Sequence, residues 1–208
     1  EDFLMMRDSD TRTLAPYASR NKYHKLTTDI ELTDIPFNYY TEVFENYFDG
    51  QEHSIRISTS TLKSALFEDI KLTNSHDIAI KNLRIECAIS SDRDISILAE
   101  YLISGTIENC LVIGNIESAQ EAAGFVNLIG KNGFIKNCAF SGKIVNRTST
   151  SVGGIASINR GVIEDCFVEG EIRSSEHAGG IVCFLEESGI IRNCKFSGDI
   201  AVTIYGSA

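Results

Sequence analysis

One short phrase recurs four times in this sequence, and its cysteine returns at a constant step of 28 residues. The phrase opens with glycine, carries isoleucine two positions later, and closes with Asn-Cys or Asp-Cys at Cys110, Cys138, Cys166 and Cys194. A fixed repeat of 20 to 50 residues is typical of a solenoid, in which each repeat buries its apolar face only by stacking on its neighbours. This spacing constrains the fold more than any other feature of the chain.

The residues that follow each cysteine alternate, which identifies the elements of the solenoid as strands. After Cys138, the positions Phe140, Gly142 and Ile144 are small or apolar, whereas those between them are mixed. A period of two is that of a half-buried strand, and a helical repeat would need a period of 3.6. We therefore expect an all-β fold, a right-handed parallel β-helix of about 28 residues per coil, the hand following from crossover chirality.

Two registers of the repeat are expected to form ladders inside or at the corner of the coil. The cysteine position faces inward, and the residue before it is Asn or Asp, which suits a turn because these side chains tolerate turn conformations and bond nearby backbone. An amide or metal ladder is the alternative interpretation. The ladder residues are Leu83, Cys110, Cys138, Cys166 and Cys194 in the first register and Asn82, Asn109, Asn137, Asp165 and Asn193 in the second.

Six cysteines raise the question of disulfides or zinc. The sequence has no Cys-x-x-Cys pair and no histidine at ligand spacing, so a zinc site is not indicated. Cysteines stacked on neighbouring parallel strands point the same way, which strains a bridge between them. We expect reduced thiols that pack as small apolar groups, with vertical disulfides as the alternative, and we expect no metal or cofactor.

The first 60 residues differ from the repeats and are expected to cap them. Residues 1–8 read as a short amphipathic helix that would cover the end of the stack and protect its first ladder. Strands are expected at Leu26–Leu32 and Gln51–Ile57. Residues 61–208 are expected to form the coils as one continuous domain cut from a longer protein.

The C-terminal end has no comparable cap. The fourth phrase runs into Gly198–Ala208, which begins another coil without a helix, proline or charged run after it. Stable solenoids cap their ends. We therefore expect that the natural protein continues past Ala208 and that the last strand, near Ala201–Tyr205, is the least protected.

An aromatic segment gives the first candidate binding surface. Ile35–Tyr47 carries several rings, among them Tyr39, Tyr40 and Tyr47. Such rings could stack on a sugar or a peptide. The competing interpretation is that the segment tucks its rings against the end of the solenoid, because buried aromatic side chains usually serve packing.

An acidic cluster gives the second candidate surface. Glu169, Glu171 and Asp199 should meet on the outer strand face, because residues one coil apart lie about 5 Å from each other at the backbone. A pair of carboxylates in a glycosidase or a calcium site of oxygen ligands is geometrically allowed. The favoured interpretation is an ordinary charged face, in which Lys143 and Lys195 offset the acids.

Charge and hydropathy exclude several classes of partner. The formal net charge is −10 and the sequence pI is about 4.9, which disfavours nucleic acid and anionic membranes because both need a basic surface. No apolar run approaches the ~18 residues of a membrane span, so direct membrane insertion is not expected. The remaining partners are a host protein or glycan and further domains of the same chain.

At this point the wording of the repeat becomes recognisable. The pattern Gly-Gly-Ile-Ala followed by Asn-x-Gly-x-Ile-x-[Asn/Asp]-Cys-x-x-x-Gly-x-Ile resembles the GLUG repeat of bacterial surface proteins, over roughly residues 20–200. The resemblance implies a β-helical module in an adhesin, a large cell-wall protein or the N-terminal region of an immunoglobulin A-cleaving metallopeptidase. Those peptidases carry His-Glu-x-x-His in a separate domain, and no such spacing is present here.

The sequence therefore predicts a non-catalytic module of a cell-surface or secreted bacterial protein, acting in adhesion or as a presenting or stalk domain. No catalytic constellation is assigned and the chain is not expected to be an enzyme. A carbohydrate-active β-helix, as lyase or hydrolase, is the alternative, and an accessory domain of a secreted metallopeptidase is a third. The expected location is extracellular or at the cell surface.

Overall fold

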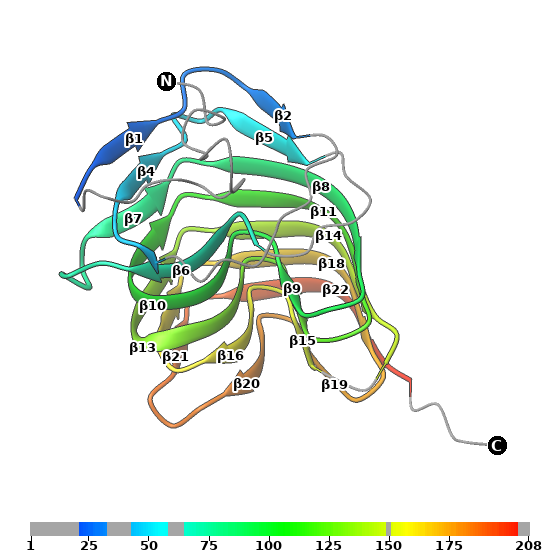
Figure 1. Ribbon diagram of the computed structural model, residues 1–208. Helices are drawn as coiled ribbons and strands as arrows, with labels where there is room; N and C mark the ends of the chain where they lie inside the picture. Colours follow the sequence, from blue (N-terminus) through cyan, green and yellow to red (C-terminus); the bar gives the residue numbers. More distant parts are fainter. Residues whose placement is uncertain (1–20, 33–42, 58–64, 149–150, 204–208) are drawn as a thin grey trace.

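The computed structural model describes residues 21–32, 43–57, 65–148 and 151–203, and shows a solenoid of stacked parallel strands (Figure 1). Every regular element in these ranges is a strand, and the strands of neighbouring coils pair in parallel. The predicted all-β parallel solenoid is therefore confirmed. The right-handed winding stays a prediction from crossover chirality.

Three sheets form the sides of the coil within the described residues. One seven-stranded sheet, whose strands lie one below another in Figure 1, contains β2 (Ile30–Leu32), β5 (Ser54–Ile57), β8 (Arg84–Ser91), β11 (Leu111–Ser118), β14 (Ala139–Asn146), β18 (Phe167–Ser174) and β22 (Lys195–Val202). A four-stranded sheet contains β9 (Ile95–Ser96), β12 (Ala122–Ala123), β15 (Ser151–Gly153) and β19 (His177–Gly179).

The third side is the largest, with eleven strands among the described residues. Its members are β1 (Tyr23–Lys25), β3 (Val43–Phe44), β4 (Tyr47–Asp49), β6 (Phe67–Lys71), β7 (Ile78–Lys81), β10 (Ala99–Glu108), β13 (Val126–Lys136), β16 (Ala156–Asn159), β17 (Val162–Glu164), β20 (Val182–Leu185) and β21 (Ile190–Arg192). A regular coil runs through the seven-stranded, four-stranded and eleven-stranded sides in that order, as β11, β12 and β13 do.

The strand register confirms the 28-residue step. Val112 pairs with Phe140, and Phe140 pairs with Val168 on the next strand. One coil earlier the step is 27, since Val112 pairs with Ile85, so Leu83 occupies the position of Cys110 as expected. Each copy of the repeated phrase therefore occupies the same position in successive coils.

The cysteine register lies inside the coil. Leu83, Cys110, Cys138 and Cys166 are buried, each at most 3% exposed. Cys194 was expected to be fully buried and is only partly so, because no described strand stacks on the coil formed by β20, β21 and β22. The expected inward register is therefore present, and its last member, Cys194, lies at the end of the described stack.

The thiols are also hydrogen-bonded, which the apolar interpretation missed. The Sγ atom of Cys138 donates to the carbonyl of Lys136 at 3.1 Å, and the same contact recurs at 3.2 Å from Cys166 to Glu164 and from Cys194 to Arg192. Burial raises the pKa of Cys138 well above its usual value. The described cysteines are all free thiols.

The Asn/Asp register forms the corner between two sides of the coil. All five of its members have left-handed backbone conformations, with φ between 49° and 54° at Asn82, Asn109, Asn137, Asp165 and Asn193. Asn and Asp accept this conformation more readily than other non-glycine residues. The turn interpretation is therefore correct. An amide contact is added only at Asn109, whose Nδ2 lies 3.4 Å from Asn82 Oδ1.

The glycine pairs serve close packing rather than positive φ. In the pair Gly153–Gly154, Gly154 does not have a positive φ, and a Cβ there would lie 2.2 Å from the Gly180 carbonyl oxygen of the next coil. The positive φ values fall instead in the strand glycines, such as Gly142 at 145°. A Cβ on Gly142 would lie 2.0 Å from the Gly114 oxygen.

Several expectations concern the ends of the chain. The helix at residues 1–8, Tyr39, Tyr40 and the residues after Thr203 lie outside the described residues. The expected strand Leu26–Leu32 is wrong in extent, because the segment contains only β2 and the chain turns before Ile30. The second expected strand, Gln51–Ile57, is found over Ser54–Ile57 as β5, and Gln51 and Glu52 form a turn before it.

Replacing Gly142 by alanine should destabilise the protein by about 2–4 kcal/mol, because a left-handed backbone and a backbone clash are imposed together. Urea denaturation measures the loss, with Ser141→Ala on the outer face of the same strand as the matched control. A loss for Gly142→Ala no larger than that of the control would contradict the close approach between coils.

Alkylation of the native protein should label Cys183 and Cys194, which are partly exposed, and leave Cys87, Cys110, Cys138 and Cys166 unlabelled. Thiols sealed in a core react only after unfolding. Mass spectrometry after denaturation without reductant should show six labels. Four labels would indicate one disulfide, and rapid native labelling of Cys138 would contradict its burial.

Candidate functional site

The predicted acidic cluster on the seven-stranded sheet is an ion-paired surface. The register places Glu171 between Lys143 and Asp199, as expected. Lys143 Nζ lies 3.0 Å from Glu171 Oε2, and the Arg173 guanidinium contacts the other carboxylate oxygen. Glu169 is opposite Ser197 and is exposed. The ordinary charged face is the interpretation that this geometry supports.

A row of alternating charges crosses the outer face of the eleven-stranded sheet. The row comprises Lys25, Asp49, Lys81, Glu108, Lys136, Glu164 and Arg192, each opposite the next on adjacent strands. Asp49 lies 3.5 Å from Lys81, and Glu164 lies 3.8 Å from Lys136 and 2.8 Å from Arg192. Opposite charges on facing positions stabilise a sheet, and like charges there destabilise it.

A second cluster of acids lies where the eleven-stranded and four-stranded sides meet, and we call it the acidic corner. It consists of Glu68 and Glu100, which oppose each other on β6 and β10, together with Asp69, Asp94 and Glu121. No ion pair to any of these five appears among the contacts of the described residues. Like charges therefore face one another here.

This arrangement changes the protonation of the corner. Burial, with the charges of Asp69 and Glu100, raises the pKa of Glu68 to about 7. Burial also raises the pKa of Glu100, against a 2.9 Å hydrogen bond donated by Asn127 Nδ2. Asn127 is buried, and its Oδ1 has no hydrogen-bond partner in the described structure. Glu68 therefore titrates near neutral pH.

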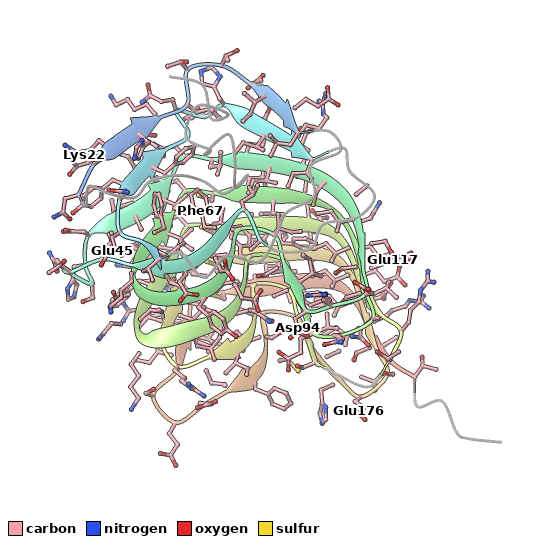
Figure 2. The ribbon with its side chains drawn as sticks, viewed as in Figure 1. Lys22, Glu45, Phe67, Asp94, Glu117 and Glu176 are labelled. Atoms are coloured by element: carbon pink, nitrogen blue, oxygen red, sulfur yellow. The ribbon has the colours of Figure 1, made fainter. Side chains whose placement is uncertain are left out.

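The third arrangement is a groove across β1, β4 and β7, with a volume of about 540 Å³. Its lining includes Tyr23, Tyr47, His24, His76, Asp49, Asp77, Lys25 and Lys81. The segments that carry it lie side by side, since Tyr47 N donates to the Lys22 carbonyl at 2.8 Å. Lys22 and Glu45, which flank these strands, both lie on the left-hand outer surface in Figure 2.

Two tyrosines dominate the groove. The rings of Tyr23 and Tyr47 stack with centroids 4.4 Å apart and planes 13° from parallel. The Tyr47 hydroxyl donates to Asp77 Oδ2 at 3.0 Å, and Asp77 Oδ1 accepts from Asn74 Nδ2 at 2.8 Å. Burial and the Asp77 carboxylate raise the pKa of Tyr47. Of the three tyrosines predicted as a binding surface, Tyr47 lines this groove, and Tyr39 and Tyr40 lie outside the described residues.

Asp49 is held on the floor of the same groove. It accepts hydrogen bonds from the backbone of Gln51 and from Asn82 Nδ2, both at 3.0 Å. Burial acts to raise the pKa of Asp49, but these donors and Lys81 outweigh it and leave that pKa lowered. Asp49 is therefore an ionised acceptor.

Sequence reasoning missed most of these residues because they lie in the irregular coils. Tyr23, Asp77, Glu68 and Glu100 belong to no repeated phrase. The available signal for Tyr23 was its place three residues before the expected strand, and for Glu68 its acidic neighbour Asp69. Neither signal indicates which residues of other coils will meet them.

The described residues contain no group of three or more His, Cys, Asp or Glu side chains arranged to hold a metal ion. No helix among them is long and apolar enough to cross a membrane.

Stability should fall as the pH rises from about 5 to about 8. Glu68 binds a proton up to a pKa of about 7 in the folded protein but only to about 4.5 when unfolded, so the folded state holds more protons in this window and loses that advantage as pH increases. Thermal unfolding at several pH values measures the slope. Glu68→Gln should flatten it, whereas the exposed control Glu169→Gln should not; an unchanged slope in Glu68→Gln would contradict the shift.

Comparison with known proteins places these features in context. Residues 174–201 match the model of the GLUG motif. The chain is 23% identical over 184 residues to the immunoglobulin A1 protease of Streptococcus pneumoniae strain ATCC BAA-255 / R6, and a second immunoglobulin A1 protease from this species matches equally. The match covers 83% of this chain and 9% of the relative, so the chain spans about a tenth of the length of these curated proteins.

A solved structure has the same fold. A crystal structure from Bacteroides ovatus, described as a candidate immunoglobulin A1 protease, superposes with a TM-score of 0.69 at 24% identity, over 86% of this chain and 60% of that one. This likeness concerns the fold alone. The expected resemblance to GLUG-repeat proteins and to a region of immunoglobulin A1 proteases is thus confirmed.

Proposed function

We propose that this chain is a non-catalytic accessory module of a secreted or cell-surface bacterial protein, which serves as a rigid stalk or presenting domain or in adhesion. The observation that carries the proposal is the continuous in-register stack, whose outer faces are rows of paired charges. Such a stack has a fixed length and direction because each coil is bonded to the next. The predicted adhesive role and extracellular location both belong to this proposal.

The relatives support an accessory role. The matched region is a small share of proteins named as immunoglobulin A1 proteases, as expected for a module joined to larger functional parts. The four histidines of this chain show no His-Glu-x-x-His spacing, which separates it from a zinc peptidase centre. The partners we propose are a host protein or glycan and further domains of the same polypeptide.

Two measurements test this function. Antibodies raised against the chain should bind intact cells of the source bacterium or its culture medium, and external trypsin should remove the cell-bound signal. The purified chain should show no cleavage of immunoglobulin A1 and no release of reducing or unsaturated sugar from polysaccharides. Staining only after cell lysis, or measurable turnover by the purified chain, would overturn the proposal.

The acidic corner favours a second candidate, a glycan hydrolase. A carboxyl group with a raised pKa close to further carboxyl groups is a combination that glycoside hydrolysis uses, and Glu68, with Asp69 and Glu100 as its charged neighbours, provides it, whereas Glu171 is neutralised by Lys143 and Arg173. If polysaccharide hydrolysis is detected, Glu68→Gln should abolish it and Glu169→Gln should preserve it. Hydrolysis unaffected by Glu68→Gln would exclude the corner as its source.

A further inference from the structure

We propose that the groove across β1, β4 and β7 binds a neutral glycan, with the stacked rings of Tyr23 and Tyr47 as the platform for one sugar ring. This inference deepens the proposed function by naming the ligand class of one surface. Binding of a glycan in the groove requires no catalysis. The groove lies on β1, β4 and β7, whereas Glu68 and Glu100 of the acidic corner lie on β6 and β10. Glycan binding by the groove can therefore be disproved without disproving the proposed accessory function, and the reverse also holds.

The tyrosine pair links the core to an open surface, because Tyr47 packs partly against the core and Tyr23 is exposed. Strand alternation sends Phe48 inward, where it is 2% exposed, and leaves Tyr47 on the outer side. Tyr23 is opposite Tyr47 and 77% exposed, so one face of its ring stacks and the rest remains open. A large aromatic side chain left this exposed contributes little to burial but offers a flat apolar surface.

The platform is rigid before a ligand arrives. Tyr47 is fixed by its hydroxyl contact to Asp77, which is itself fixed by Asn74, and Tyr23 is fixed by stacking on Tyr47. Rigid aromatic anchors bind with a small entropy cost because few rotamers are lost. One face of a pyranose ring is a patch of C–H groups that fits a flat aromatic surface.

The polar lining indicates a neutral, hydroxyl-rich ligand. Lys25 and Lys81 offset Asp49 and Asp77, so the formal charge of these four lining groups sums to zero and selects neither an anion nor a cation. The lining includes donors and acceptors, namely Lys25, Lys81, Asp49 and Asp77, and a sugar hydroxyl can bond to both kinds. A concave site with an apolar floor and a few fixed polar groups is the usual form of a small-ligand site.

The position of the rings on the sheet also favours a glycan over a peptide as the ligand. A peptide that adds as a strand needs an open strand edge, whereas the rings of Tyr23 and Tyr47 lie on the face of the sheet and not at the edge that β1 leaves unpaired among the described residues. A pyranose needs only the face. The ligand that fits is therefore a hexose or hexosamine unit of a glycan.

The test uses the full chain with methyl β-galactoside, methyl β-glucoside, N-acetylglucosamine and lactose at about millimolar concentration, where single-sugar binding is expected. Saturation-transfer NMR identifies the sugar that binds, and titration followed by tyrosine emission gives its affinity, because the chain has no tryptophan. A mixed glycan array extends the search to larger neutral glycans. Binding of at least one neutral glycan is the expected result.

Three variants assign the binding to the groove. Tyr23→Ala should weaken binding at least tenfold, and Tyr23→Phe should keep most of it because the ring remains. Tyr101→Ala is the matched control, since Tyr101 is 41% exposed on β10 and outside the groove; it should leave affinity unchanged. Circular dichroism and thermal unfolding establish that the variants are folded.

Three outcomes would overturn the proposal. The first is that no neutral glycan binds on the array or at millimolar concentration. The second is binding that Tyr23→Ala leaves unchanged, which would place the sugar elsewhere. The third is selective binding of anionic or cationic ligands alone, which the charge balance of the groove does not allow. Absence of hydrolysis would not bear on this site.

Discussion

Backbone stacking on backbone is the constraint on which the rest of this structure depends. Adjacent parallel strands lie about 4.8 Å apart, so each position in a coil must tolerate its equivalent directly above and below. The left-handed corner at Asn137 and its equivalents allows the chain to turn without lengthening the coil. Gly142 lies so close to Gly114 that no side chain fits. The repeated phrase is the set of residues that satisfies this spacing.

Stacking also decides where charges can be placed. An acidic chain with a formal net charge of −10 would align carboxylates at the strand spacing if its coils were identical. The outer row from Lys25 to Arg192 avoids this by reversing sign at every step, and Glu171 is flanked by Lys143 and Arg173. A slip of one position along a strand would set this row against other residues, so the alternation also specifies register.

The regular part of the fold could be predicted from sequence because each position is repeated. The cysteine ladder, the Asn corner and the register of Glu171 with Asp199 all follow from counting. The partial exposure of Cys194 and the thiol contacts to carbonyls could not, because they depend on what lies above the last coil and on side-chain direction. Tyr47 was identified as a candidate, but its stacking partner Tyr23 was not, because the step between them is 24 residues rather than 28.

The irregular coils are where candidate sites can form. Phe48 pairs with Ile80, a step of 32 residues, and the additional residues include the turn that carries His76 and Asp77 to the groove. In a regular coil the same positions are committed to stacking, as Phe134 is between Thr106 and Val162 on the neighbouring strands. Glu68 and Glu100 likewise oppose each other where the phrase is absent. Departure from the repeat relaxes the stacking requirement, and polar groups of different coils can meet there in arrangements that the repeats do not contain.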